Sequence, residues 1–205
     1  MKSIRKKITV SLMATVLIAL IAVGSSSITL NYRSTLATVK EMMSETTVLA
    51  AERIEQELSA YKNVAVDTGR IPQLSDEEVS QEEKRAIIDE RVNMHGFRRG
   101  NIINSDGYSI FDGKDYSDRE YVQQAMQGNV YVSEPLVSKV TGELSIMVAA
   151  PIYAGGDGSS DIVGVVYFVP QETFLNDIVS SIKLSDSCHA YMLNKLGDTI
   201  ADTTL

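Results

Sequence analysis

Residues 115–153 read DYSDREYVQQAMQGNVYVSEPLVSKVTGELSIMVAAPIY, and this stretch decides the fold. It opens with Ser117-Asp118-Arg119-Glu120, a capping-box pattern that predicts the start of a short helix, and Gly128 predicts the end of that helix. Three strand-like runs follow, at residues 130–137, 144–153 and 162–169. Because turn sequences join each run to the next, we expect three antiparallel strands after the helix.

The segment before this stretch adds a helix and a hairpin. Ser80-Gln81-Glu82-Glu83 is a second capping box, and Gly96 predicts the end of the helix that it begins. Strand-like residues at 100–103 and 108–111 flank a turn sequence at 104–107. The order of helix, hairpin, short helix and three strands predicts an α+β domain with one central antiparallel sheet.

The segment after it begins a second unit. A connecting helix is expected at 171–182, and a hairpin with strands near 189–193 and 199–202 follows. The sequence of this hairpin, YMLNKLGDTIA, is similar to NIINSDGYSIF at 101–111. This weak repeat predicts that 183–205 begin another domain of the same type, in a chain that is a fragment of a longer protein.

The N-terminal segment determines the topology. Between Ile8 and Leu30 no side chain is charged, and about 20 apolar residues at about 1.5 Å each are enough to cross a bilayer. The basic residues within 1–7 favour the cytoplasm, so we expect a transmembrane helix at 8–30 and an extracytoplasmic location for the rest. The alternative is a cleaved signal peptide, because Ala22-Val23-Gly24 has the small residues of a cleavage site.

A long stalk helix is predicted at 31–68. Its apolar or small residues recur at spacings of three and four, which indicates one helical face; they are Leu36, Val39, Met43, Thr47, Ala50, Ile54, Leu58, Tyr61 and Ala65. This face is expected to pair with a second copy of the chain in a homodimer, to pack on its own domain, or to do both along different parts.

Charge and cysteine content limit the partners. Past the apolar segment, 15 Lys and Arg stand against all 27 Asp and Glu, a balance of about −12 that disfavours nucleic acid. Cys188 is the only cysteine and cannot form an internal disulfide, so a buried thiol is expected.

The run from Asp115 to Tyr153, followed by GVVYFVP at 164–170, resembles double Cache domains, the extracytoplasmic sensors of methyl-accepting chemotaxis proteins and sensor kinases. The resemblance implies a PAS-like, ligand-binding, membrane-distal Cache domain at 69–170 and a membrane-proximal one that begins at 183. It further implies a second transmembrane helix and an output module, for chemotaxis, histidine-kinase or cyclic-dinucleotide signalling.

Arg119 is the first candidate binding residue, because a cation is disfavoured at a helix N-terminus and a guanidinium fork suits a carboxylate. The alternative is a salt bridge to a nearby aspartate. Amino-acid-binding members of the family follow this arginine with tryptophan and tyrosine and place an aspartate near the end of the last strand; the matching residues here are Tyr121, Val122 and Val169. The resemblance therefore favours a small carboxylate over a plain α-amino acid.

The predicted ligand-binding residues are Arg119, Tyr121, Tyr131, Tyr108, Ser145 and Tyr167, although each tyrosine is equally compatible with packing on the sheet. The sequence carries no motif of a metal site, a cofactor site or a catalytic centre, so no enzymatic activity is expected. Two other classes compete with a membrane receptor: a secreted or surface-held binding protein, and an assembly protein without a ligand.

Overall fold

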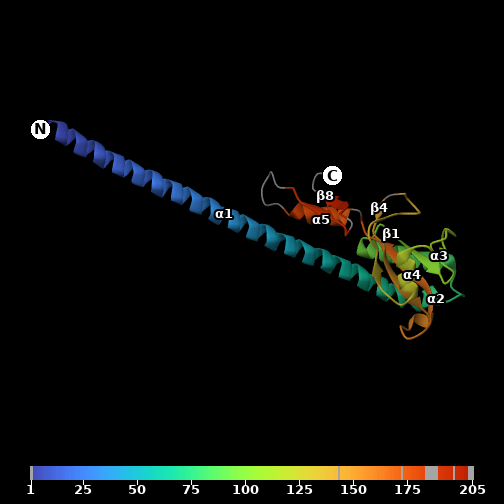
Figure 1. Cartoon of the computed structure of the whole chain (residues 1–205). Coiled ribbons are helices and arrows are strands. Elements are labelled where there is room, and N and C mark those ends of the chain that lie inside the picture. The colour runs from blue at the N-terminus through green and yellow to red at the C-terminus, as the bar shows by residue number, and fades with distance from the viewer. Residues whose placement is uncertain (1, 143, 172, 183–188, 196, 203–205) are drawn as a thin grey trace. The chain divides into compact units, whose positions relative to one another are not determined.

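The structure is a computed structural model, and it describes residues 2–142, 144–171, 173–182, 189–195 and 197–202 (Figure 1). Cys188 and the first residues of the predicted second domain lie outside these ranges. The chain divides into two compact units, Met1–Leu49 and Ala50–Leu205. Helices and an antiparallel sheet are both present, so the predicted α+β class is confirmed.

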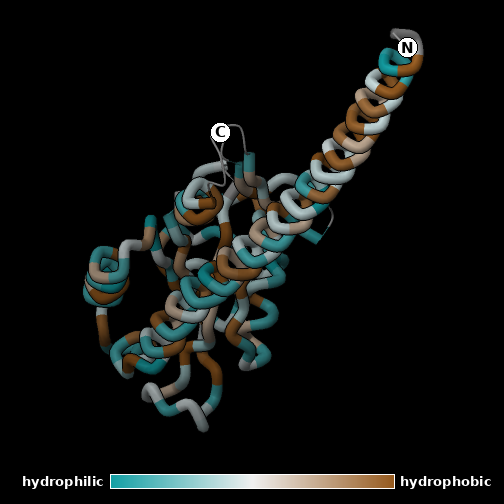
Figure 2. The backbone as a smooth tube through the Cα atoms, turned by 90° about the vertical axis from the view of Figure 1, so that its left-hand side faces the viewer, coloured by the Kyte–Doolittle hydropathy of each residue, from teal (hydrophilic) through white to brown (hydrophobic). Residues whose placement is uncertain are grey.

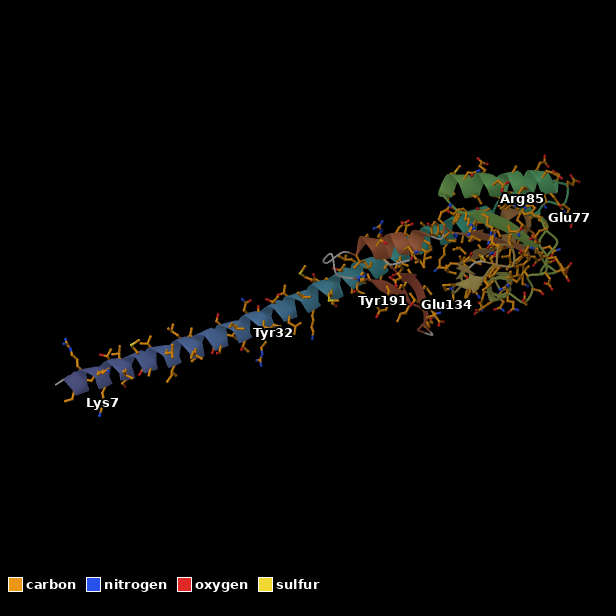
Figure 3. The ribbon with its side chains drawn as sticks, turned by 90° about the horizontal axis from the view of Figure 1, so that it is seen from above. Lys7, Tyr32, Glu77, Arg85, Glu134 and Tyr191 are labelled. Carbon is orange, nitrogen blue, oxygen red and sulfur yellow. The ribbon has the colours of Figure 1, made fainter. Side chains whose placement is uncertain are left out.

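Helix α1 spans Lys2–Gly69 without interruption, so the predicted membrane span and stalk belong to one helix. By length and composition α1 contains one stretch that is able to cross a membrane, and no residue of that stretch is buried. The hydroxyl of Thr15 donates to the carbonyl of Ser11 at 2.8 Å, which satisfies this polar group inside the helix. Apolar residues predominate towards the N-terminal end (Figure 2), and Lys7 and Tyr32 lie to either side of the apolar stretch (Figure 3).

Two helices follow α1. α2 spans Pro72–Ser75 and α3 spans Gln81–His95. The capping box predicted for α3 is confirmed: the Glu83 N–H donates to the Ser80 hydroxyl at 3.2 Å, and the Ser80 N–H donates to the Glu83 carboxylate at 3.0 Å. Gly96 ends the helix in the left-handed conformation, with φ of 68°.

A four-stranded antiparallel sheet, in the order β1-β6-β5-β2, forms the centre of the second unit. Its strands are β1 Arg99–Asn104, β6 Ile162–Val169, β5 Val148–Tyr153 and β2 Tyr131–Val132. Two small sheets pair β3 Leu136–Val137 with β4 Leu144–Ser145, and β7 Tyr191–Leu193 with β8 Thr199–Asp202. The remaining helices are α4 Glu120–Met126, the 3-10 turn η1 Ala154–Gly156 and α5 Thr173–Ser181.

Each face of the central sheet has its own core, because successive residues of a strand point to opposite faces. One core joins α1 and α3 to the sheet through Ala65, Ile88, Ile102, Val166 and Phe168. The other joins α4 to the sheet through Val122, Ala125, Ile103, Val165 and Tyr167. We call the second face the α4 face.

The predicted return strand at 108–111 is wrong. Only isolated bridges form there, between Ile103 and Ser109 and between Tyr108 and Asp115. The Ser109 hydroxyl accepts hydrogen bonds from the backbone N–H groups of residues 111 and 112, both at 3.2 Å. These side-chain contacts turn the backbone away from a regular strand ladder.

The capping box predicted at Ser117 is also wrong. α4 begins at Glu120, and its N-cap is Arg119, which makes no side-chain cap. The Ser117 N–H instead donates to the Asp115 carboxylate at 2.8 Å, which holds this residue in a turn before the helix. The strand expected at 130–137 divides into β2 and β3, and a proline at 135 stands between them.

Candidate ligand-binding site

One row of cross-strand partners runs over the α4 face. It consists of Asn101 on β1, Tyr167 on β6, Ala149 on β5 and Tyr131 on β2. Tyr121 of α4 lies against this row, because its ring is 5.2 Å from the ring of Tyr167. The row brings together side chains that are far apart in the sequence.

Three tyrosines form the centre of the site. Tyr116 lies just before α4, with its ring 6.0 Å from that of Tyr167, and Tyr121 meets Tyr167 edge to face. Each of the three side chains is at most 2% exposed. Such ring pairs contribute about 0.5–1.5 kcal/mol beyond their buried area, so the cluster is a packed aromatic core.

Polar contacts link the tyrosines to the first strand. Asn101 Nδ2 donates to the Tyr167 hydroxyl at 3.4 Å, and the Ser109 hydroxyl donates to Asn101 Oδ1 at 3.1 Å. The Tyr116 hydroxyl donates to the Asp112 carboxylate at 3.3 Å. These bonds fix the orientation of the phenol groups on the α4 face.

Burial raises the pKa of Tyr116, Tyr121 and Tyr167 above the usual range of a phenol. The nearby phenol groups add to the rise at Tyr116 and Tyr121. All three hydroxyls therefore stay neutral at physiological pH and serve as hydrogen-bonding groups.

Arg119 lies at the edge of this cluster. Its side chain is 23% exposed, and its Nε is 4.0 Å from the Asp118 carboxylate, the outer limit of an ion pair. Asp118 also pairs with Lys139, and the hydrogen bond from Lys139 is the main cause that lowers the pKa of Asp118. Arg119 therefore shares its aspartate with a second cation and keeps donors for another partner.

Lys139 holds the loop between β3 and β4 over the site. Its ammonium donates to the Asp115 carbonyl at 2.7 Å and to the carboxylate of Asp118. It also lies 5.5 Å from the centre of the Tyr116 ring. The loop is thus connected to the residues that precede α4.

Arg99 and Ser138 were not among the predicted binding residues. The Arg99 guanidinium donates from Nη2 to the Ser138 hydroxyl at 2.7 Å, and its buried Nε has no hydrogen-bond partner among the described residues. Asn101 and Tyr116 were also missed. Strand alternation places Arg99, Asn101 and Ile103 on one face, but the sequence does not indicate which face α4 covers.

The structure brings some of the predicted residues together and separates others. Tyr121 and Tyr167 are in contact, and half-buried Tyr131 lies in the row of cross-strand partners that contains Tyr167. Arg119 is two residues before Tyr121 in the sequence. Tyr108 is 47% exposed on the turn after β1.

Ser145 lies at another place. It lines a cavity of about 70 Å³, together with residues of α5 and β8. Its buried hydroxyl has no hydrogen-bond partner. Ser145 is four residues from Ala149, the neighbour of Tyr167, a separation of about 13 Å at 3.3 Å per residue.

The described part of the chain contains no group of three or more His, Cys, Asp or Glu side chains arranged to hold a metal ion. The buried groups of the α4 face are phenols, an amide, hydroxyls and one guanidinium. This set suits recognition of a polar or anionic organic molecule by hydrogen bonds.

An antiparallel sheet of this order, with helices packed on both faces, is a PAS-like α+β fold. The chain belongs to the Cache domain family, whose sequence model matches residues 31–204. None of the curated proteins matches the chain in sequence.

Solved structures of chemoreceptor sensory domains share the fold. The ligand-binding domain of Campylobacter jejuni Tlp3, in complex with 4-methylisoleucine, aligns with a TM-score of 0.66 and 16% identity over 84% of this chain and 71% of that chain. The Pseudomonas aeruginosa amino acid chemoreceptor PctC, in complex with GABA, aligns with a TM-score of 0.63 and 17% identity over 80% of this chain and 75% of that chain. Pseudomonas fluorescens CtaA, in complex with L-serine, aligns with a TM-score of 0.58 and 15% identity over 75% of this chain and 67% of that chain.

Proposed function

We propose that this chain belongs to a bacterial transmembrane receptor, most simply a chemotaxis receptor. It supplies one membrane-spanning helix and the extracytoplasmic sensing domain that follows it. The α4 face binds a small molecule, and α1 holds the domain at the cell membrane. The observation that carries the proposal is a buried tyrosine cluster, with Arg119 at its edge, on one face of a Cache-family sheet. The three solved structures named above are chemoreceptor domains bound to amino acids, which supports a small-molecule ligand here.

The ligand is proposed to be a small carboxylate that contacts Arg119, Tyr121, Tyr167 and Tyr131. Arg119 and the tyrosines supply donors for a carboxylate and a surface for an organic body. A plain α-amino acid is disfavoured, because apolar Val169 is where amino-acid-binding members of the family carry an aspartate. A buried ammonium without a counter-charge is costly.

The wider architecture is proposed to be a double Cache receptor. Residues 69–170 are its membrane-distal domain, 171–182 its connecting helix, and 183–205 the start of the membrane-proximal domain. The receptor is a homodimer paired along α1. A ligand shifts such a dimer only if it binds one arrangement more tightly than the other.

Fractionation of cells that express the chain tests the anchor. We expect the chain in the membrane fraction with Lys2 still present, and we expect protease added to spheroplasts to digest the domain after α1. A soluble product that begins at Ser25 would contradict membrane anchoring and favour a secreted binding protein. A chain protected from protease in intact spheroplasts would contradict the proposed topology.

A further inference from the structure

Arg99 occupies a specific place on the α4 face. It is the first residue of β1 and stands opposite Val169 in the register, two residues from the pair of Asn101 and Tyr167. Ile103 on the same strand packs into the α4-face core, and Val169 belongs to that core as well. Alternation therefore directs Arg99 to the face that carries the tyrosine cluster.

The surroundings of the Arg99 guanidinium are incomplete. One nitrogen donates to the buried Ser138 hydroxyl at 2.7 Å, whereas the buried Nε has no hydrogen-bond partner within the described part of the chain. Among the described residues no carboxylate lies within ion-pair distance of Arg99. The cation is close enough to Tyr167 to act on the pKa of its hydroxyl.

The missing counter-charge of Arg99 costs free energy, and a bound anion would remove this cost. A guanidinium cannot lose its proton in a protein, and a partly buried cation without a counter-charge is destabilising. A carboxylate supplies two acceptors in the planar geometry that the guanidinium fork fits. Arg119 has less need of such a partner, because Asp118 is 4.0 Å away.

Three aspartates near the tyrosine cluster already form hydrogen bonds or ion pairs. Asp112 accepts from the Tyr116 hydroxyl and the Lys114 N–H, Asp115 accepts from the Ser117 N–H, and Asp118 pairs with Lys139. The residue opposite Arg99 is apolar Val169. Among the described residues, these three aspartates thus already have partners, whereas Arg99 offers a cation to the ligand.

We infer that Arg99 is the anion anchor of the site, and that the site takes a small organic acid without an ammonium group, an assignment that rests on the proposed sensing function. The ligand carboxylate lies against the Nε edge of Arg99. Tyr167 and Asn101 lie beside it and form hydrogen bonds with the ligand. The ligand body lies beside the tyrosine cluster.

Matched acids test the ligand class. Isothermal titration calorimetry of the full chain in lipid nanodiscs would compare succinate with L-aspartate, glutarate with L-glutamate, and propionate with L-alanine. The members of each pair differ by one amino group. We expect at least one acid to bind, and to bind ten-fold or more tightly than its amino counterpart. Tighter binding of the amino acids, or no binding by any of the three acids, would overturn the assignment.

Variants test the anchor. Arg99→Gln is expected to lower the affinity for the best-binding acid by ten-fold or more. Arg99→Lys keeps the charge but loses the guanidinium fork, and it is expected to lower this affinity less. Arg91→Gln is the matched control, because Arg91 lies on α3 at the opposite face and its replacement makes the same change in charge. Binding by Arg99→Gln equal to that of the wild-type chain would refute the role of Arg99.

Stability separates a binding role from a structural one. Replacing an uncompensated buried cation by an apolar residue of similar length is neutral or stabilising, so Arg99→Met should keep or raise the melting temperature while binding is lost. A fall in melting temperature that accompanies the loss of binding would assign Arg99 to the fold instead.

The two proposals fail in different ways. Binding that survives Arg99→Gln but is lost in Arg119→Gln or Tyr121→Ala would retain the sensing site and reject the anchor. Acid binding that survives all three substitutions would reject the α4 face as the sensing site.

Discussion

Tyr167 connects most of the interactions on the α4 face. Its ring contacts the rings of Tyr116 and Tyr121, and its hydroxyl accepts a hydrogen bond from Asn101. The side chain is 1% exposed, so these contacts replace water completely. One residue thus joins the strand that carries Arg99 to the helix that follows Arg119.

Removing the Tyr167 hydroxyl separates its polar role from its aromatic role. Tyr167→Phe keeps the ring contacts but leaves the Asn101 amide without this acceptor. We expect the free energy of unfolding to fall by about 1–2 kcal/mol, because a buried donor loses its partner. Urea titration followed by circular dichroism measures the change. Tyr108→Phe serves as the control, since that side chain is 47% exposed, and an equal loss in both variants would contradict the polar role.

The loop between β3 and β4 is the element that closes over the site. Ser138 binds Arg99, and Lys139 binds the residues that precede α4. The first contact joins the loop to the end of β1, and the second joins it to the turn before α4. A change at Arg99 therefore reaches this loop directly.

The contact between Lys139 and Asp118 predicts a pH dependence. The hydrogen bond from Lys139 lowers the pKa of Asp118 in the folded state, so its contribution is present above the unfolded pKa of about 4 and is lost as pH falls through the lower folded pKa. Because the Asp118 side chain is 66% exposed, solvent screening limits the contribution to about 0.5 kcal/mol. Lys139→Met should therefore lose more stability relative to the wild-type chain at pH 7 than at pH 3.

Thermal unfolding at the two pH values measures this difference. Lys195→Met is the matched control, because Lys195 is 92% exposed and its nearest carboxylate oxygen, on Glu134, is 3.8 Å away. A stability loss for Lys139→Met that is the same at both pH values would attribute the effect to packing and reject the ion pair.

The elements that the sequence predicts well are those set by neighbouring residues. The α3 capping box needs only Ser80 and Glu83, three positions apart, and it forms as expected. The same pattern at Ser117 fails, because Asp115 takes the Ser117 N–H first. Local competition of this kind leaves no trace in a pattern of residue types.

The residues that meet at the candidate site were harder to predict, because their positions depend on pairing between distant strands. Arg99 meets Val169 only when β1 pairs with β6. Alternation groups Arg99 with Asn101 but does not identify the face that α4 covers. Tyr121 and Tyr167 were found through the family resemblance, whereas Ser145 was chosen from the same strands and lines a separate cavity.

The central sheet connects the α4 face to α1. The two are on opposite sides of one sheet, since Ala65 of α1 packs in the core that includes Ile102 and Val166. Ile103 and Val165, the adjacent residues of the same strands, pack on the α4 face. Strands β1 and β6 therefore contact both layers, and a shift of either strand changes both.

The proposed homodimer pairs along α1, and the exposed apolar stripe in residues 31–49 predicts where the second copy of the helix lies. Leu36, Val39 and Met43 are between 42% and 46% exposed on a helix segment that carries charges elsewhere. Apolar side chains that recur at helical spacing are stabilised when another helix covers them. We expect two copies to meet along this stripe.

Cysteine cross-linking in native membranes tests the pairing. In a Cys188→Ser background, Met43→Cys and Thr47→Cys should form disulfide-linked dimers on mild oxidation, because both positions lie on the stripe. Glu45→Cys is the control, since two residues along a helix turn the side chain by about 200°, away from the Met43 position. Equal cross-linking at 43, 45 and 47 would indicate random collision, and none at 43 and 47 would show that the stripe does not face a second copy. Dimers that form at 43 and 47 alone, and that change in yield when the best-binding acid is added, would connect the sensing face to the membrane helix.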